Sequence, residues 1–375
     1  MRKLGTSNGA PVGARALVTS VVREAGRTVA SGFVRLVDLA DGRVLMTSSV
    51  PESAFRTRDP NPRGGLRGAR GVTVGAGRLV VANTERLLVF ETSWRLVGEL
   101  GHPLAGGIHD ILAVDDGVWV TATSADLLLK LGWDGSLLTA WEWRGDAALA
   151  AALGFLRLTP VDRGRDYRDP ESLRHGVPNL AHLNAVSPRP GGLLVSLGRV
   201  LSPAAYRRRR LAGLAGWVAR GLGLGRRSGG PRPLAGPPSR IRGSSTAFVG
   251  LADDLSAELL GRVGDIDVPN HNALEVDGHL VYNDSNGSRL VARPLDGNSP
   301  ERAVALPGDP SFPRGLAHLG GGRFLVGNQG PLALYEVDLD EERIVARIPL
   351  PGEPRESAYG ICLIPDSFDD PPAGL

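Results

Sequence analysis

Three histidines, His109, His182 and His271, stand at or beside the first residue of short apolar segments that we expect to be β-strands. Imidazoles that converge from three strands can bind a divalent metal and leave one coordination position for water or substrate. A metal held in this way acidifies the bound water or polarises a carbonyl group. The three histidines therefore predict a catalytic site that binds zinc, iron, manganese or calcium.

Each histidine has a polar companion one or two residues later, and these are Asp110, Asn184 and Asn272. Carboxyl and amide groups in these positions can orient an imidazole ring by hydrogen bonds. They also lie close enough to the histidines to contact a substrate, so we expect them to contribute to substrate binding.

Arg314, Tyr359 and Arg70 occupy the corresponding place in three further segments. Together with the histidines they would surround the site with hydrogen-bond donors and positive charge. This combination suits an anionic or oxygen-rich ligand, because a guanidinium group matches the geometry of carboxylate and phosphate. We expect Arg314 to act in catalysis and Arg70 and Tyr359 to bind substrate. The alternative is that the two arginines form ion pairs between neighbouring repeats.

The sequence lacks the common motifs of nucleophilic and nucleotide-dependent enzymes. It has no Gly-x-Ser-x-Gly, no phosphate-binding glycine loop, no His-Glu-x-x-His and no cysteine pair. Paired carboxylates are not prominent at the expected strand starts either, so glycosidase-type catalysis is not indicated.

The elements that must position these residues form a repeat of about 40 residues. Each unit has a short apolar strand, a glycine-containing turn, a second apolar strand that ends in Asn or Ser, and a third strand. Residues 70–83, 109–123, 271–283 and 314–328 show the pattern. A repeat of this length made of short strands is typical of a β-propeller, in which every innermost strand begins near one central channel.

Counting these units predicts six blades and an all-β fold. One blade is split between the chain ends: residues 357–364 form its innermost strand, and strands in residues 16–22, 32–38 and 43–49 complete it. Pairing of the terminal strands then closes the propeller and leaves no open edge. The other five blades are expected at residues 68–103, 107–145, 180–268 (interrupted by an insertion), 269–310 and 312–354. We expect one propeller domain over residues 15–366, with a flexible N-terminus at 1–14 and a C-terminal tail at 367–375.

The register of His182 differs from that of the other two histidines. When the companion residues are aligned, His109 and His271 coincide, but His182 lies one residue earlier. A shift of one residue reverses the direction of a side chain along a strand. His182 therefore reaches the channel only if its strand begins with a bend. The alternative reading is that the histidines cap strand ends and bond neighbouring blades.

Two segments interrupt the repeat. Residues 146–179 begin with a helical stretch at 147–153 and continue as a charged loop. Residues 202–243 contain a basic segment with apolar residues at helical spacing, followed by a stretch rich in Gly, Pro and Arg. Such a helix suits an anionic membrane surface or a protein partner, and the alternative is a solvated arm that packs on its own propeller. The residues expected to make these contacts are Arg207, Arg208, Arg209, Arg210, Leu214, Trp217 and Val218.

Composition agrees with a turn-rich cytoplasmic protein. The 375 residues are 42% hydrophobic and include 51 Gly and 28 Pro, which suits short strands joined by turns. The single cysteine, Cys362, excludes an intrachain disulfide, which fits a reducing compartment. Cys362 lies in an apolar strand and is expected in the core. We find no signal peptide and no apolar stretch long enough to span a membrane. The net charge is only +3, and we expect no specific nucleic-acid partner.

Together, several strand-start motifs resemble those of an uncharacterised bacterial family of six-bladed β-propellers that is loosely similar to the NHL and SMP-30-like propellers. The motifs are Ile108-His109-Asp110, His182-Leu183-Asn184, Pro269-Asn270-His271-Asn272, Phe312-Pro313-Arg314-Gly315-Leu316 and Leu325-Val326-Gly327-Asn328. The resemblance covers residues 65–363, and the insertion at 202–243 departs from it. It implies the fold and a polar channel site, but no reaction. The acidic first metal ligand of the gluconolactonase-like propellers has no counterpart here, so lactonase activity is not indicated.

These observations leave two hypotheses for the function. The first is a metal-dependent lyase or hydrolase that acts on a small polar or anionic substrate, with Arg314 binding the anionic group. The second is a non-catalytic binding or scaffold propeller, located in the cytoplasm or peripherally on a membrane, that docks a partner through residues 202–243.

Overall fold

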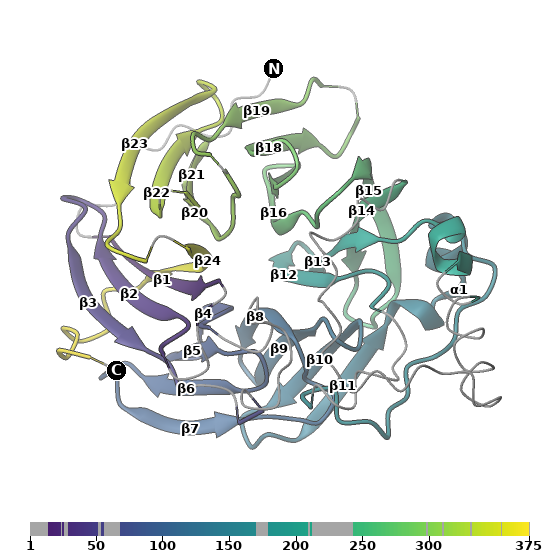
Figure 1. Cartoon of the computed structure of the whole chain (residues 1–375), viewed down its shortest axis with the longest axis horizontal. Helices are drawn as coiled ribbons and strands as arrows, with labels where there is room; N and C mark the ends of the chain where they lie inside the picture. The colour runs from purple at the N-terminus through teal and green to yellow at the C-terminus, as the bar shows by residue number, and fades with distance from the viewer. Residues whose placement is uncertain are drawn as a thin grey trace, which may run out of the picture.

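The chain forms six four-stranded antiparallel sheets arranged around a common centre (Figure 1). This computed structural model describes residues 14–23, 25, 29–51, 54–55, 68–169, 179–208, 211, 243–297, 299–309, 311–330, 332–353 and 355–374. The architecture is the predicted six-bladed β-propeller.

Each blade runs from an innermost strand near the centre to an outermost strand at the rim. The first consists of β4 (Val72–Gly75), β5 (Arg78–Ala82), β6 (Leu87–Glu91) and β7 (Leu96–Leu100). The second consists of β8 (Ile108–Val114), β9 (Gly117–Ala122), β10 (Leu127–Gly132) and β11 (Leu137–Glu142). The third consists of β12 (Leu183–Arg189), β13 (Gly192–Val200), β14 (Ser244–Leu251) and β15 (Ala257–Ile266).

The remaining blades continue around the propeller. The fourth consists of β16 (His271–Val276), β17 (His279–Asp284), β18 (Arg289–Pro294) and β19 (Arg302–Ala305). The fifth consists of β20 (Leu316–Gly320), β21 (Arg323–Asn328), β22 (Ala333–Asp338) and β23 (Arg343–Pro349). The sixth combines β24 (Glu356–Ile364) with β1 (Arg15–Val22), β2 (Phe33–Asp38) and β3 (Val44–Ser49).

The sixth blade closes the propeller as predicted. Strand β24 pairs antiparallel with β1, with Leu17 opposite Cys362. A buried ion pair reinforces this closure, because the Arg35 guanidinium on β2 donates to both carboxylate oxygens of Glu356 on β24. The closure therefore depends on both strand pairing and a matched pair of buried charges.

The hydrophobic core lies between adjacent blades. The middle strands are covered on both faces by neighbouring sheets, so their sequences are nearly continuous apolar runs. In β5 the run Leu79-Val80-Val81-Ala82 is buried throughout, and β10 begins with three buried leucines. Outermost strands such as β7 and β15 are mostly exposed or half-buried, and only the last residue of each is buried, because these strands lie at the rim.

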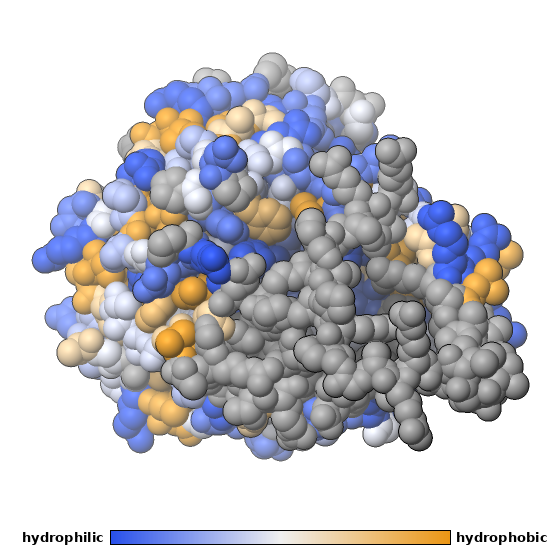
Figure 2. Space-filling view, viewed as in Figure 1, coloured by the Kyte–Doolittle hydropathy of each residue, from blue (hydrophilic) through white to orange (hydrophobic). Residues whose placement is uncertain are grey.

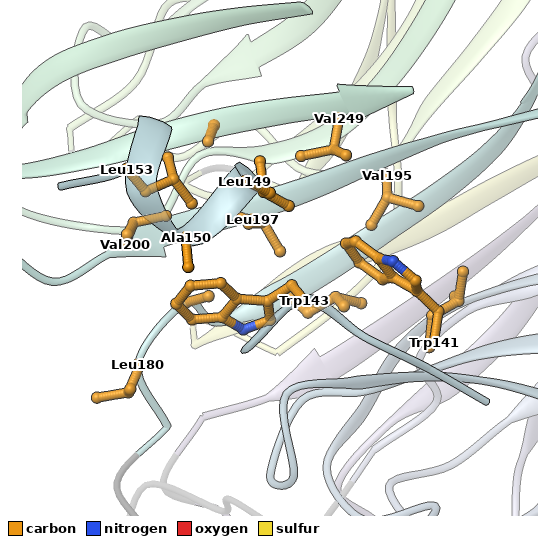
Figure 3. Packing of buried hydrophobic residues seen from close by; sticks show 14 of the residues in the cluster. Trp141, Trp143, Leu149, Ala150, Leu153, Leu180, Val195, Leu197, Val200 and Val249 are labelled. Atoms are coloured by element: carbon orange, nitrogen blue, oxygen red, sulfur yellow. The ribbon is translucent and has the colours of Figure 1, made fainter. Parts of the chain in front are cut away.

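A helical segment follows β11, as predicted for residues 147–153. The 3₁₀ turn η2 (Trp143–Gly145) leads into helix α1 (Ala147–Ala152), whose first turn is capped by the Asp146 carboxylate accepting from the Leu149 amide at 2.9 Å. Figure 3 shows Trp141 and Trp143 packed among aliphatic side chains of α1, β13 and β14. Leu180 belongs to the same cluster, so this packing also anchors the chain just before β12.

The second insertion is described only at its two ends. Residues 203–208 are helical, and Arg207 and Arg208 are exposed there. The predicted contacts at Arg209, Arg210, Leu214, Trp217 and Val218 lie outside the described residues, as do the first 13 residues of the predicted N-terminal segment. None of the helices in the described ranges has the length and apolar character needed to cross a bilayer.

Candidate functional site

Each blade places one of the predicted residues near the start of its innermost strand. These six residues, here called the central cluster, are Arg70 (before β4), His109 (β8), His182 (before β12), His271 (β16), Arg314 (before β20) and Tyr359 (β24). In the view of Figure 2 the molecule is hollowed near the centre of the propeller, and hydrophilic residues border part of the hollow.

The three histidines contact one another in blade order. The rings of His109 and His182 meet edge to face, with centroids 4.7 Å apart. The rings of His182 and His271 follow in the same orientation at 6.4 Å. The side chains that the sequence separates by 162 residues (271 − 109) therefore form one continuous group.

Arg314, Tyr359 and Arg70 complete the circle. The Arg314 guanidinium donates to Nε2 of His271, and its Cζ lies 4.5 Å from the centroid of the Tyr359 ring. Arg70 donates to the Tyr359 hydroxyl at 2.6 Å, and the ring of Tyr359 lies 5.7 Å from that of His109. All six blades thus contribute to one set of neighbouring side chains.

Local backbone distortions aim these side chains toward the centre. His182 has φ +49°, and the register of β12 against β13 shifts immediately afterwards. This left-handed residue is the bend that the one-residue offset of His182 requires. Gly315, with φ +77°, plays the same part after Arg314, and glycine adopts this conformation without steric cost.

A buried network fixes the segment that carries His182. The side-chain oxygen of Asn179 accepts from the His182 backbone amide at 2.7 Å. The side-chain nitrogen of Asn179 donates to the Thr123 carbonyl in the second blade. The Asp126 carboxylate accepts from the amides of Leu180 and Ala181 at 2.6 and 3.1 Å and pairs with Arg144 at 2.8 Å. The position of His182 is therefore set by the blade that precedes it.

Hydrogen bonds define which nitrogen of each ring carries a proton. Nδ1 of His109 lies 2.7 Å from the Gly107 carbonyl, which only accepts, so Nε2 of neutral His109 has a free lone pair. In His271, Nε2 accepts from Arg314, so Nδ1 donates to the Ser285 hydroxyl at 2.9 Å. His109 is therefore the base of the group, whereas both nitrogens of His271 are occupied.

His182 has the opposite orientation to His109. Its Nδ1 faces the amide nitrogen of Asn179 at 3.5 Å, and an amide nitrogen only donates. Neutral His182 consequently carries its proton on Nε2. The two adjacent rings thus provide one acceptor and one donor.

Burial and positive neighbours keep the histidines neutral. Burial is the main reason why the pKa values of His109, His182 and His271 lie well below the usual range. Arg314 and other nearby cations lower them further. Burial, with smaller effects from Arg23 and Arg70, also lowers the pKa of Arg314 to about 9. At neutral pH the three histidines are therefore uncharged, and the positive charge of the central cluster lies on its guanidinium groups.

The predicted substrate-binding companions form contacts between blades. The Asp110 carboxylate accepts from the Val186 amide at 3.2 Å, and the Asn184 amide donates to the Asn270 carbonyl at 2.6 Å. Asn272 accepts from the Gly315 amide at 2.8 Å. Contact with a substrate stays a prediction for these three residues.

Two contributors near the cluster were not predicted from the sequence. Phe312 lies beneath Arg314, with Cζ 5.1 Å from the ring centroid, and contacts the ring of His271. Arg23, just after β1, also stacks on Phe312, with its Cζ 5.5 Å from the ring centroid. Its Nε donates to the side-chain oxygen of Gln329. The motif around Arg314 contains Phe312, but no sequence signal connects Arg23 with it.

The arrangement does not fit a three-histidine metal centre. Among the described residues, no group of three or more His, Cys, Asp or Glu side chains could hold a metal ion. His271 uses both nitrogens for protein contacts, and the adjacent guanidinium groups would repel a cation. A bound metal stays a prediction that elemental analysis tests, and no step below depends on it.

Comparisons with known proteins show the fold. A chain in the crystal structure of a nidogen–laminin complex is 9% identical, with 94% of this chain and 98% of that chain covered and a TM-score of 0.53. A Bacteroides caccae protein of unknown function is 13% identical, with coverage of 94% and 99% and a TM-score of 0.52. Virginiamycin B lyase from Staphylococcus aureus is 10% identical, with coverage of 76% and 71% and a TM-score of 0.43.

The sequence matches no protein-family model and no curated protein. The resemblance to NHL and SMP-30-like propellers therefore stays a prediction beyond the shared β-propeller fold.

Proposed function

We propose that the central cluster binds a small organic anion and that His109 acts on it as a general base, as in a lyase or hydrolase. The observation that carries this proposal is the environment of Arg314. Its side chain is about nine-tenths buried, and its Nε has no hydrogen-bond partner among the described residues. Among the described residues, the Arg314 guanidinium contacts His271, Tyr359 and Phe312, and none of these contacts is with a carboxylate.

A buried cation without a counter-charge is costly, so it needs compensation. Aromatic faces compensate in part through cation–π contacts. A bound carboxylate would compensate more completely, because it accepts two parallel hydrogen bonds from one guanidinium. The neutral histidines add donors without adding negative charge, which further favours an anion.

The two adjacent histidines supply acid–base groups beside that anion. Nε2 of His109 is a neutral acceptor, which is the state a general base needs. In a lyase reaction this nitrogen takes the proton from a carbon, the C–H electron pair forms the new double bond, and the leaving group departs with its own electron pair. In a hydrolase the proton comes from water. The Nε2–H of His182 is available to stabilise developing negative charge on oxygen.

Binding is tested by calorimetric titration with acetate, lactate, succinate and methyl phosphate. Wild type is compared with Arg314→Gln and with Arg343→Gln, in which the changed arginine is exposed on β23 and pairs with Glu341. We expect at least one anion to bind wild type and Arg343→Gln alike and to bind Arg314→Gln about tenfold more weakly or worse, since a charge-assisted contact is lost. No binding to wild type, or equal binding to all three proteins, would contradict the proposal.

Catalysis needs a second measurement on the same proteins. We expect NMR spectra of an anion that binds to change with time in the presence of wild type and not of His109→Gln. Binding without conversion would favour the non-catalytic propeller. Elemental analysis of the same preparations measures zinc, iron, manganese and calcium, and one equivalent lost in a His109→Ala/His271→Ala variant would restore the metal hypothesis.

A further inference from the structure

The two insertions that interrupt the repeat pack against each other at the outer edge of the propeller, where α1 projects in Figure 1. The ring of Phe155, just after α1, meets the ring of Tyr206 edge to face, with centroids 5.7 Å apart. Both rings belong to one buried apolar cluster. The two insertions therefore form a common body, here called the lateral lobe, which consists of residues 146–158, residues 203–208 and Leu211.

The outward side of α1 carries no polar side chain. Leu149 and Ala150 point into the packing around Trp143, as Figure 3 shows, and both are buried. The other four residues of the helix are exposed alanines, namely Ala147, Ala148, Ala151 and Ala152. A surface helix usually places charged or polar residues opposite its buried side, and a helix that is apolar all round is normally buried. Alanine is also the strongest helix former, so the alanines alone indicate little.

Two exposed leucines give the lateral lobe a more strongly apolar surface. The exposed fraction is 104% for Leu156, four residues after α1, and 65% for Leu211, which follows the helical residues 203–208. A leucine exposed singly needs no explanation, but apolar residues that gather on one part of a surface indicate an interaction site. Figure 2 shows hydrophobic and hydrophilic residues side by side at this edge of the molecule.

The exposed charges of the lateral lobe have one sign. They are the guanidinium groups of Arg157, Arg207 and Arg208, and no described carboxylate forms an ion pair with any of them. Within the residues that define the lobe, the one carboxylate is that of Asp146, which is half-buried and caps α1. The lobe thus combines apolar side chains with positive charge.

We propose that the lateral lobe docks the propeller on a membrane surface that contains anionic lipids. Leu156 and Leu211 would enter the boundary between headgroups and acyl chains, and the three arginines would pair with lipid phosphates. Apolar side chains beside arginines are typical of segments that lie in the plane of this interface. An anionic leaflet attracts each nearby arginine and offers phosphates at every lateral position, whereas a protein partner would need acidic groups placed to match. No residue of the central cluster belongs to the lobe, so this inference is independent of the proposed anion site.

The test is co-sedimentation of the full chain with phosphatidylcholine vesicles prepared with and without phosphatidylglycerol. We expect wild type to bind vesicles that contain phosphatidylglycerol about tenfold or more tightly than phosphatidylcholine alone, because three arginines meet the anionic surface. Leu156→Ser/Leu211→Ser should bind the anionic vesicles about tenfold more weakly than wild type, since less apolar surface is buried. Arg157→Gln/Arg208→Gln should lose about fivefold for each arginine removed.

Two exposed residues outside the lateral lobe provide matched controls. Leu138 on β11 has an exposed fraction of 48%, and Arg343 on β23 is exposed beside Glu341. Leu138→Ser and Arg343→Gln should bind the anionic vesicles as wild type does. If they lose as much affinity as the lobe variants, or if the lobe variants lose none, the proposal is wrong.

Measurements on wild type cover the case in which a variant does not fold, as judged by circular dichroism. Affinity for the anionic vesicles should fall as NaCl is added, because salt screens the arginines. Binding that depends on neither NaCl nor phosphatidylglycerol would overturn the proposal. No binding of wild type to either vesicle would also overturn it, and a protein partner would then be the better explanation of the lobe. The anion titrations of the central cluster should be unchanged in the lobe variants, so the two proposals fail separately.

Discussion

Two buried arginines in this propeller have opposite surroundings. Arg35 on β2 donates to both oxygens of Glu356, and both side chains are almost completely inaccessible. Arg314 before β20 is nearly as buried, yet among the described residues it faces an imidazole and two aromatic rings. Within the described ranges, a matching carboxylate therefore lies at one site and not at the other.

The difference separates a charge that is paired within the fold from one that we propose to be compensated by a ligand. Arg35 and Glu356 connect the strands from the two ends of the chain, where the propeller must close. Arg314 lies where six blades converge, and none of its contacts among the described residues is with a carboxylate, which is why we propose that a bound anion compensates its charge. Variants that remove charge at each site should therefore differ in the size of their effect on stability.

The largest effect is expected at the closure. Glu356→Gln leaves the Arg35 cation buried without its partner, which should lower the free energy of unfolding by about 3–5 kcal/mol. Urea denaturation followed by circular dichroism measures this change. Glu341→Gln, which breaks the exposed pair with Arg343, is the control and should cost less than about 1 kcal/mol. A loss below about 1 kcal/mol in Glu356→Gln would show that closure does not depend on this pair.

A smaller, pH-dependent effect is expected at Asp110, a half-buried carboxyl group that has backbone amides rather than an arginine as partners. Burial raises the pKa of Asp110 to about 7, above its ordinary value of 3.8. The folded state thus retains a proton that the unfolded state releases, and stability falls as the pH rises from about 4 to 7.

The corresponding variant is Asp110→Asn. Wild type should lose on the order of 1 kcal/mol more than this variant between pH 5 and pH 8, a value that allows for the partial exposure of the side chain. Urea denaturation at the two pH values measures the difference, and Asp134→Asn in an exposed turn serves as the control. Identical pH dependence in wild type and Asp110→Asn would refute the assignment.

The sequence predicted the blades and the members of the central cluster because both follow from the repeat. Apolar strands and glycine turns recur at a fixed spacing, so the first residue of each innermost strand could be identified. The offset of His182 also showed that this residue needs a bend to reach the centre, and the positive φ of His182 provides it. Closure by the terminal strands was predicted for the same reason, since the C-terminal unit lacked outer strands.

Other features depend on contacts that the repeat does not encode. Arg23 reaches Phe312 across 289 positions (312 − 23), from the end of a strand with no motif. Substrate contact by Asp110 and Asn272 stays a prediction, and their hydrogen bonds to the next blade are revealed only by the relative placement of the sheets. The occupied nitrogens of His271 likewise depend on Ser285 and Arg314.

The smallest effect on stability is expected at Arg314, and it completes the contrast with Arg35. Arg314→Gln removes a donor to His271, which costs roughly 0.5–1.5 kcal/mol, but it also removes a buried cation that burial and two other arginines disfavour. These effects oppose each other, so the free energy of unfolding without ligand should change by less than about 1 kcal/mol. Urea denaturation in a buffer free of multivalent anions measures it beside Glu356→Gln. A loss as large as that of Glu356→Gln would mean that Arg314, too, is a structural charge, and the distinction between the two arginines would fail.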